Sequence, residues 1–152
     1  TLISLGISFE RVDTDDGTTM ESCAFISKGL GCPVVKTIFL CNRQQTVFYL
    51  YVTDAEKPFV TRDFCGVLGV PRVSFAPTEM LWEKMGTRMG ATTLLSLIND
   101  PEHTVTFVMD RDVAEREWLG CTDGTTTCFL KLSMQQVLQT FLEHTGHRLT
   151  II

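Results

Sequence analysis

The stretch VVKTIFLCNRQQTVFYLYV, residues 34–52, determines which fold the sequence predicts. It holds two apolar runs rich in β-branched and aromatic residues, and the polar residues 42–45 separate them. This pattern predicts a β-hairpin with a polar turn. Lys36 stands out, because it places a charge at the start of a strand that otherwise has the composition of a protein core.

Lys36 has three explanations. Its stem can lie on apolar surface while its ammonium reaches water, or the charge can protect an edge strand from pairing with another chain. The third explanation is a functional ammonium beside a binding site. The local sequence does not distinguish between these explanations, so observations from the rest of the chain are needed.

Composition bounds the class of protein. The chain has 152 residues, 44% of them hydrophobic, and a formal net charge of −5. These values predict a single domain over residues 1–152 with a sizeable core. Residues 2–6 have the composition of a helix end, so we expect a few N-terminal residues to be missing. No apolar run is long enough for a membrane span, and an acidic chain is poorly suited to gripping DNA along its backbone.

The six cysteines favour reduced thiols over disulfides. Most of them lie in apolar or periodic segments, as small buried thiols do. No CxxC pair occurs, the three histidines lack zinc-finger spacing, and the acidic residues 13–17 are out of register with a calcium loop. We therefore expect a cytoplasmic protein with no metal and no cofactor. A thiol-redox protein is an alternative that rests on the cysteines alone.

Short strands and helices are interspersed along the chain. Apolar patterning predicts strands over residues 7–12, 72–75, 104–109 and 125–132. The predicted helix N-caps are Thr18, Thr61, Thr78 and Ser133. Residues 94–98 have the pattern of a buried strand or turn, and residues 113–118 give a mixed signal. This order predicts an α+β fold with a mixed, curved sheet.

Few motifs carry chemistry. Neither a phosphate-binding glycine motif nor a GxSxG nucleophile motif is present. His144 and His147 flank the end of the last predicted helix, where a capping role explains them. The turns 86–93 (GTRMGATT) and 120–127 (GCTDGTTT) are rich in glycine and small hydroxyl residues. Glycine lets the backbone approach a ligand closely, although two ordinary tight turns would have the same composition.

Several segments together resemble one known family. They are KTIFLCNRQQTVFYLYV at 36–52, RVSFAP at 72–77, MGTRMGATTLLSLIND at 85–100, WLGCTDGTTTCFLKL at 118–132 and FLEHTGH at 141–147. In this order they resemble the YbaK/prolyl-tRNA-synthetase-associated editing domains, most closely the free-standing ProX-like branch. The resemblance implies an α+β domain with a mixed, barrel-like sheet and surrounding helices.

The resemblance also implies an activity and a set of site residues. Family members hydrolyse the ester between a wrongly attached amino acid and the tRNA 3′ end, most typically alanine on a proline tRNA. Lys36 and Gly90 are the implied catalytic residues. The family's GxxxP loop corresponds to residues 90–94, and its His-Pro pair corresponds to Thr122 and Asp123. The implied substrate-binding residues are Ala91, Thr92, Thr93, Leu94, Thr122 and Thr126.

We therefore expect a cytoplasmic aminoacyl-tRNA deacylase whose partner is the acceptor end of a mischarged tRNA. Prolyl-tRNA synthetase is a second expected partner, whereas a membrane and DNA are not. An ester is intrinsically labile, so a catalyst that positions water and stabilises an oxyanion is sufficient. The alternative is a catalytically weak module of the same fold that binds tRNA or a synthetase.

Overall fold

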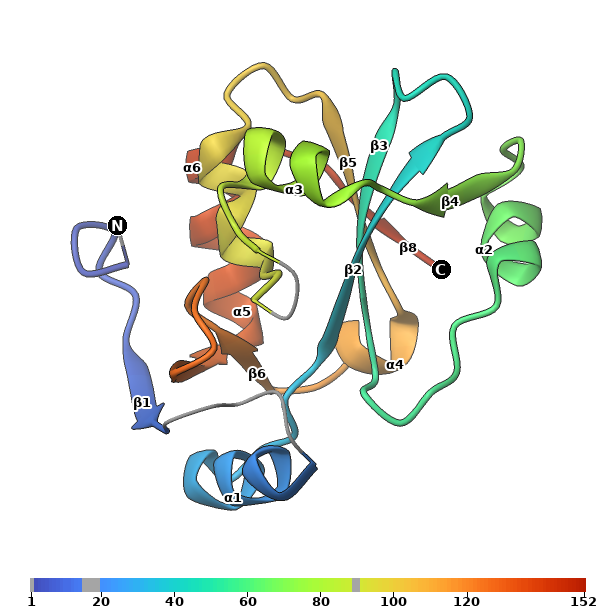
Figure 1. The fold of residues 1–152 in the computed structure, drawn as a ribbon. Helices are drawn as coiled ribbons and strands as arrows, with labels where there is room; N and C mark the ends of the chain where they lie inside the picture. Colours follow the sequence, from blue (N-terminus) through green and yellow to red (C-terminus); the bar gives the residue numbers. More distant parts are fainter. Residues whose placement is uncertain (1, 15–19, 89–90) are drawn as a thin grey trace.

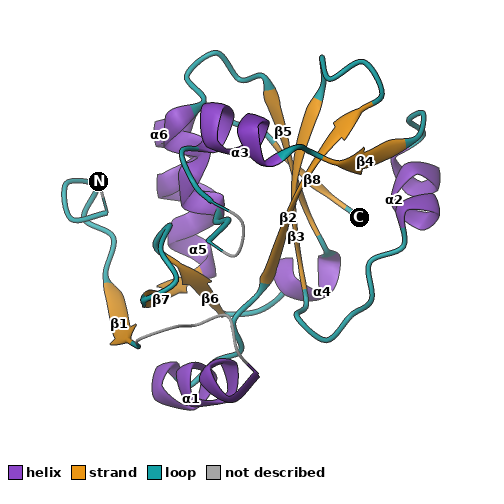
Figure 2. Cartoon of the chain, in the orientation of Figure 1, coloured by secondary structure: helices purple, strands orange, loops and turns teal. Residues whose placement is uncertain are grey.

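The computed structural model describes residues 2–14, 20–88 and 91–152, and it contains two β-sheets with helices around them (Figures 1 and 2). The strands are β1 (Phe9–Asp13), β2 (Lys36–Asn42), β3 (Phe48–Thr53), β4 (Val73–Phe75), β5 (Val105–Met109), β6 (Trp118–Thr122), β7 (Cys128–Ser133) and β8 (Leu149–Ile151). The helices are α1 (Met20–Leu30), α2 (Thr61–Leu68), α3 (Thr78–Met85), α4 (Arg111–Ala114), α5 (Met134–Gln136) and α6 (Leu142–Thr145), with the 3-10 helix η1 (Leu94–Asn99) and the π-helix η2 (Val137–Phe141).

The predicted hairpin forms the centre of the larger sheet, whose strand order is β4-β2-β3-β5-β8. Strands β2 and β3 pair antiparallel, with Lys36 opposite Thr53. Strands β3, β5 and β8 run parallel to one another, and β4 pairs antiparallel with β2. The sheet is therefore mixed, as the sequence predicts.

The smaller sheet has the order β1-β7-β6. It meets the larger sheet through an isolated parallel bridge between Val34 and Gly120. A Cβ added at Gly120 would lie 2.6 Å from the carbonyl oxygen of Pro33, so only glycine allows the two backbones to come this close. Two sheets joined at one bridge are not a closed barrel, and the expected barrel-like sheet is corrected accordingly for the described residues.

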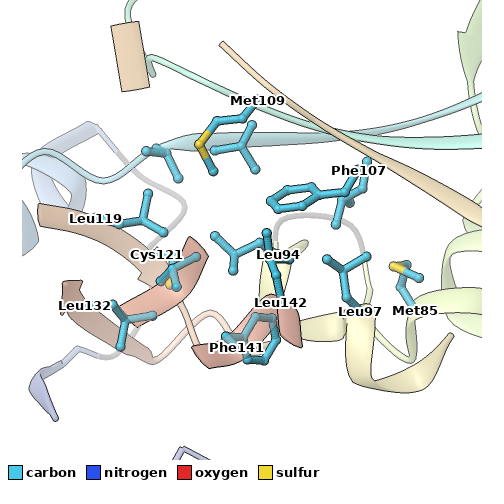
Figure 3. Close-up of a cluster of buried hydrophobic side chains, with 14 of the residues drawn as sticks. Met85, Leu94, Leu97, Phe107, Met109, Leu119, Cys121, Leu132, Phe141 and Leu142 are labelled. Carbon is cyan, nitrogen blue, oxygen red and sulfur yellow. The ribbon is translucent and has the colours of Figure 1, made fainter. Parts of the chain in front are cut away.

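The main core lies between the larger sheet and the helices that follow β7 (Figure 3). Phe107 from β5 and Leu119 from β6 face Leu94 of η1 and Phe141 of η2, and all four are essentially without solvent exposure. A second apolar layer lies on the other face of the larger sheet, where Phe64 of α2 packs against the hairpin. Figure 1 shows α2 on one side of β2 and the pair α5 and α6 on the other.

Several local predictions need correction. Residues 118–122 form strand β6 and residues 149–151 form strand β8, and neither was predicted. Thr61 and Thr78 are not N-caps but the first helical residues. The N-cap positions are occupied by Val60 and Pro77, which make no side-chain capping hydrogen bond. The predicted cap at Ser133 is confirmed, since its hydroxyl accepts a hydrogen bond from the Gln136 amide.

The predicted cap at Thr18 lies outside the described residues. Within the described part, every helix is too short or too polar to cross a membrane.

Candidate functional site

Lys36 is the first residue of β2, and its side chain is held in place. Its Nζ donates a hydrogen bond of 2.6 Å to the backbone carbonyl oxygen of Lys57, in the loop between β3 and α2. Lys36 is partly buried, so this bond is shielded from water on one side. An ammonium that donates to a carbonyl is a charge-assisted bond, which is stronger than a neutral one.

Lys36 lies on the face of the larger sheet that α2 covers. Side chains alternate between the two faces along a strand, and Ile38 and Leu40 pack in the same apolar cluster as Phe64 of α2. Phe39, on the opposite face, packs in the cluster that contains Leu94. The structure therefore separates the Lys36 ammonium from the glycine-rich turns, which adjoin the opposite face.

The two glycine-rich turns do come together. A Cβ added at Gly124 would lie 3.7 Å from the Thr87 methyl carbon and 4.0 Å from that of Thr93. Gly124 has a φ of +107°, a conformation that L side chains rarely adopt. The sequence predicts only that both turns contribute residues to one pocket. In the structure, Gly124 of the second turn lies beside Thr87 and Thr93 of the first.

The first turn contains most of the predicted substrate-binding residues. Ala91 and Thr93 are buried and Thr92 is half-buried. The Thr93 hydroxyl caps η1 by accepting from the Leu95 amide at 3.3 Å. Leu94 has no solvent exposure, and in Figure 3 its side chain points into the core beside Cys121 and Leu142 rather than toward a pocket. Gly90 lies outside the described residues.

The Thr87 hydroxyl is a polar group without a partner in the described structure. Thr87 is buried where the two turns meet, and its Oγ1 makes no hydrogen bond there. Buried hydroxyls are normally paired, so such an exception is informative. This junction therefore retains one unused polar atom beside the residues predicted to bind substrate.

The second turn uses most of its polar groups internally. The Thr122 hydroxyl donates to the carbonyl of Thr125 and accepts from the Gly124 amide. Inside the turn, hydrogen bonds are also donated by the amides of Asp123, Thr125, Thr127 and Cys128. Thr126, another predicted substrate-binding residue of this turn, is half-buried.

A hydrogen-bonded cluster at Asp110 was missed by the sequence prediction. Asp110 follows β5 and is buried, and its Oδ2 accepts from Lys57 Nζ at 2.7 Å, Thr53 Oγ1 at 2.9 Å and Tyr51 at 3.3 Å. Burial alone would raise the pKa of Asp110, but the hydrogen bonds from Lys57, the Asp112 amide and Thr53 bring it below its usual value. Hydrogen bonds to the carboxylates of Asp110 and Asp112 raise the pKa of Lys57.

This cluster borders a cavity of about 230 Å³. The cavity is lined by Tyr51, Thr53, Lys57, Pro58, Phe59, Val60, Asp63, Phe64, Val67, Asp110 and Ile152. It opens where the parallel strands β3 and β5 end, which is a frequent place for ligands in such sheets. The signal in the sequence was an aspartate directly after a buried strand.

Asp100 and His147 form a second buried pair, so the capping role predicted for His147 is wrong. His147 Nε2 lies 2.9 Å from Asp100 Oδ2, and both residues are buried. Burial tends to raise the pKa of Asp100, but hydrogen bonds from His147, Val105 and Thr104 lower it overall. The pair ties the end of η1 to the segment after α6. His144 does lie in the last turn of α6, as predicted.

Two of the described cysteines are poorly suited to thiol-redox chemistry. Cys32, Cys41, Cys65, Cys121 and Cys128 are free thiols. Burial raises the pKa of Cys121 to about 12 and that of Cys128 to about 11. Thiols with such values stay protonated at neutral pH and react slowly. In the described part of the chain, no three His, Cys, Asp or Glu side chains are grouped to hold a metal ion.

Comparison with known proteins identifies the family. The family model of the aminoacyl-tRNA editing domain matches residues 14–140. The chain belongs to this editing-domain family. It is 30% identical over 121 residues to prolyl-tRNA synthetase associated domain-containing protein 1 of Danio rerio, an alignment that covers 78% of this chain and 65% of that protein. It is 22% identical over 136 residues to the prolyl-tRNA editing protein ProX of Acetoanaerobium sticklandii, covering 90% and 83% of the two chains.

Solved structures share the fold of this editing domain. The hypothetical protein APE2540 superposes with a TM-score of 0.71 at 19% identity and covers 99% of this chain and 94% of its own. A candidate trans-editing enzyme for prolyl-tRNA synthetase gives a TM-score of 0.69 at 16% identity, covering 99% and 90%. The family resemblance and the α+β fold predicted from the sequence are thus confirmed.

Proposed function

We propose that this editing domain is an aminoacyl-tRNA deacylase that removes a wrongly attached amino acid in the cytoplasm, with alanyl-tRNA for proline as the leading substrate. The observation that carries the proposal is the editing-domain match over residues 14–140. The similarity to a ProX protein supports the choice of a proline tRNA. The chain spans 65% of the length of the Danio rerio relative, whose name refers to prolyl-tRNA synthetase. An association with that synthetase is therefore a further part of the proposal.

The proposed reaction needs few protein groups. A water oxygen bonds to the ester carbonyl carbon, an oxyanion forms, and the ribose oxygen leaves with a proton. The substrate's own ribose hydroxyl assists, as in the family. Amides of the first glycine-rich segment are proposed to stabilise the oxyanion, because preorganised donors need no reorganisation during the reaction. The second turn is less suited to that task, since most of its amides already donate internally.

The amino-acid pocket is proposed at the junction of the two turns. Ala91, Thr92 and Thr126 form its wall, and the unpaired Thr87 hydroxyl is available for hydrogen bonding. Leu94 acts behind this wall as a core residue that supports Thr93. A small pocket of this kind suits a small amino acid better than a large one.

Lys36 is proposed to bind a phosphate of the tRNA that precedes the adenosine carrying the ester. To do so its ammonium exchanges the Lys57 carbonyl for a substrate group. A compact ammonium with three donors can make that exchange without moving β2. The contact would be formed on the α2 side of the sheet, away from the oxyanion.

A binding module is the second candidate. It is favoured by the internal engagement of two predicted site residues, since the Lys36 ammonium and the Thr122 hydroxyl both bond within the protein. Such a module would hold the tRNA end or a synthetase without accelerating ester hydrolysis.

A deacylation assay separates the two candidates. Purified protein is mixed with labelled alanyl-, seryl- and cysteinyl-tRNA for proline, and ester half-lives are compared with buffer. We expect acceleration, greatest for alanine, and its loss in Gly90→Val while the circular dichroism spectrum is unchanged. Gly66→Ala is the matched control, because Gly66 has open space around it in α2. Half-lives equal to buffer for all three esters would leave only the binding module.

A further inference from the structure

We propose that Trp82 and Arg88 form a stacking platform for a base in the single-stranded 3′ end of an RNA. Trp82 lies on α3 and is 57% exposed. The guanidinium carbon of Arg88 lies 5.6 Å from the centre of the Trp82 ring. This inference rests on the proposed function and adds to it a surface that holds the RNA.

The exposure of Trp82 is not required by the packing of α3. Leu81 and Met85 are the buried residues of this helix and attach it to the core. Trp82 lies on the same helix but is more than half exposed, so much of its large apolar ring remains in water. Tryptophan is highly buried on average, and exposed aromatic side chains near a functional site often mark a binding surface.

The platform is connected to the described residues on both sides of positions 89 and 90. The Gly86 amide donates to the Trp82 carbonyl at 2.9 Å, which ends α3. The Ala91 amide donates to the Arg88 carbonyl at 3.0 Å, which links Arg88 directly to Ala91. A base that stacks on Trp82 would therefore bring its attached chain toward the first glycine-rich turn.

The chemistry of the pair fits single-stranded RNA. Unpaired bases stack on aromatic rings and on the planes of arginine guanidinium groups. An arginine beside the ring also offers a positive charge to a phosphate. The chain has a net charge of −5, so recognition by stacking with one cation suits it better than a broad basic surface.

The chain contains its own control. Trp118 on β6 is also partly exposed, at 42%, and the Lys131 ammonium lies 4.6 Å from its ring centre. This second tryptophan–cation pair belongs to the smaller sheet, whereas Trp82 lies on the helix that directly precedes the first glycine-rich turn. The two tryptophans can be observed separately in the variants Trp118→Phe, which retains Trp82, and Trp82→Phe, which retains Trp118.

The test is tryptophan fluorescence during titration with a short single-stranded RNA that ends like a tRNA. We expect quenching in Trp118→Phe and none in Trp82→Phe. We also expect Trp82→Ala to weaken RNA binding by about 5- to 150-fold, the equivalent of about 1–3 kcal/mol for one stacked base. Trp118→Ala should bind as the parent does. Arg88→Gln should reduce the dependence of the logarithm of affinity on that of salt concentration by about 0.7.

Quenching of Trp118 equal to that of Trp82, or unchanged binding in Trp82→Ala, would overturn the platform. The same experiments test the stacking platform and the proposed deacylation independently. A parent protein that binds RNA through Trp82 but leaves the ester intact contradicts deacylation alone. A parent that deacylates alanyl-tRNA, and whose Trp82→Ala variant does so equally well and binds RNA equally well, contradicts the platform alone.

Discussion

The Lys36 ammonium lies 2.6 Å from the backbone carbonyl oxygen of Lys57, while the Lys57 ammonium lies 2.7 Å from Asp110. The two lysines thus connect the start of β2, the loop after β3 and the end of β5. A residue proposed to contact substrate is in this way part of a network that also shapes a cavity.

We predict that Lys36→Ala lowers the kcat/KM for deacylation of alanyl-tRNA by about a hundredfold or more, since a misplaced ester loses its reactive geometry. Stability should fall by only about 1 kcal/mol, because water can replace the ammonium at the partly exposed carbonyl. Lys36→Met keeps the apolar stem and should be as inactive as Lys36→Ala. Lys36→Arg should recover part of the activity. Parent-like turnover in Lys36→Met would show that the ammonium only anchors the loop.

Asp110 should make stability dependent on pH. Its pKa is lower in the folded protein than the value of about 3.9 expected for an unfolded chain. Its stabilising contribution is therefore complete above that unfolded value and is lost as pH falls through the lower folded value. Urea unfolding of the parent and of Asp110→Asn at pH values from about 6 to about 2.5 measures this contribution.

We expect Asp110→Asn to cost about 2 kcal/mol at neutral pH, because the amide cannot pair with Lys57 as a carboxylate does. The difference between parent and variant should shrink in acid. A constant difference across the whole pH range would mean that Asp110 does not titrate below the unfolded value.

Gly120→Ala should destabilise the domain. Its Cβ would meet the Pro33 carbonyl oxygen at 2.6 Å, so the bridge between the two sheets must move. We expect a loss of about 2–3 kcal/mol, comparable to other overpacked sites.

Gly66→Ala is the opposite case, because Gly66 lies within α2 and an added Cβ would meet open space. It should raise stability by about 0.5–1 kcal/mol. Thermal unfolding of both variants checks the contrast, and equal melting temperatures would contradict it.

Thr122 should matter for the shape of the second turn. Thr122→Val removes the hydroxyl that bonds to Thr125 and Gly124, so we expect a loss of about 1–2 kcal/mol and slower deacylation. Thr122→Ser keeps the hydroxyl and should remain close to the parent in both. If valine lowers activity without lowering the melting temperature, Thr122 contacts the substrate directly.

The hairpin and the family were predictable because the residues that determine them are adjacent in the sequence. Strand β6 was not predictable, since the contact that determines its place is made with a segment far away in the sequence. Trp118 is exposed and Gly120 is required by its contact with Pro33, so neither residue has the usual pattern of a strand. The role of His147 was missed for the same reason, because its partner Asp100 lies 47 positions earlier.

The candidate site was predictable as a set of segments but not as a geometry. The sequence indicated both glycine-rich turns, and the structure brings them together at Gly124. It gave no sign that Lys36 points to the face of the sheet opposite the turns, because that depends on which segments later in the chain cover each face. Nor could it show that Leu94 belongs to the core, since an apolar residue in a turn suits a pocket wall and a core equally well.

The pairing of β1 with β7 has a consequence for the rate of folding. It aligns Phe9 with Leu132 and Asp13 with Cys128, which are among the most distant contacts the chain can make. Folding rates fall as the mean sequence separation of contacts increases. During synthesis β1 therefore emerges early and waits without its partner until residues 128–132 have left the ribosome, so the smaller sheet cannot be completed until most of the domain has been made.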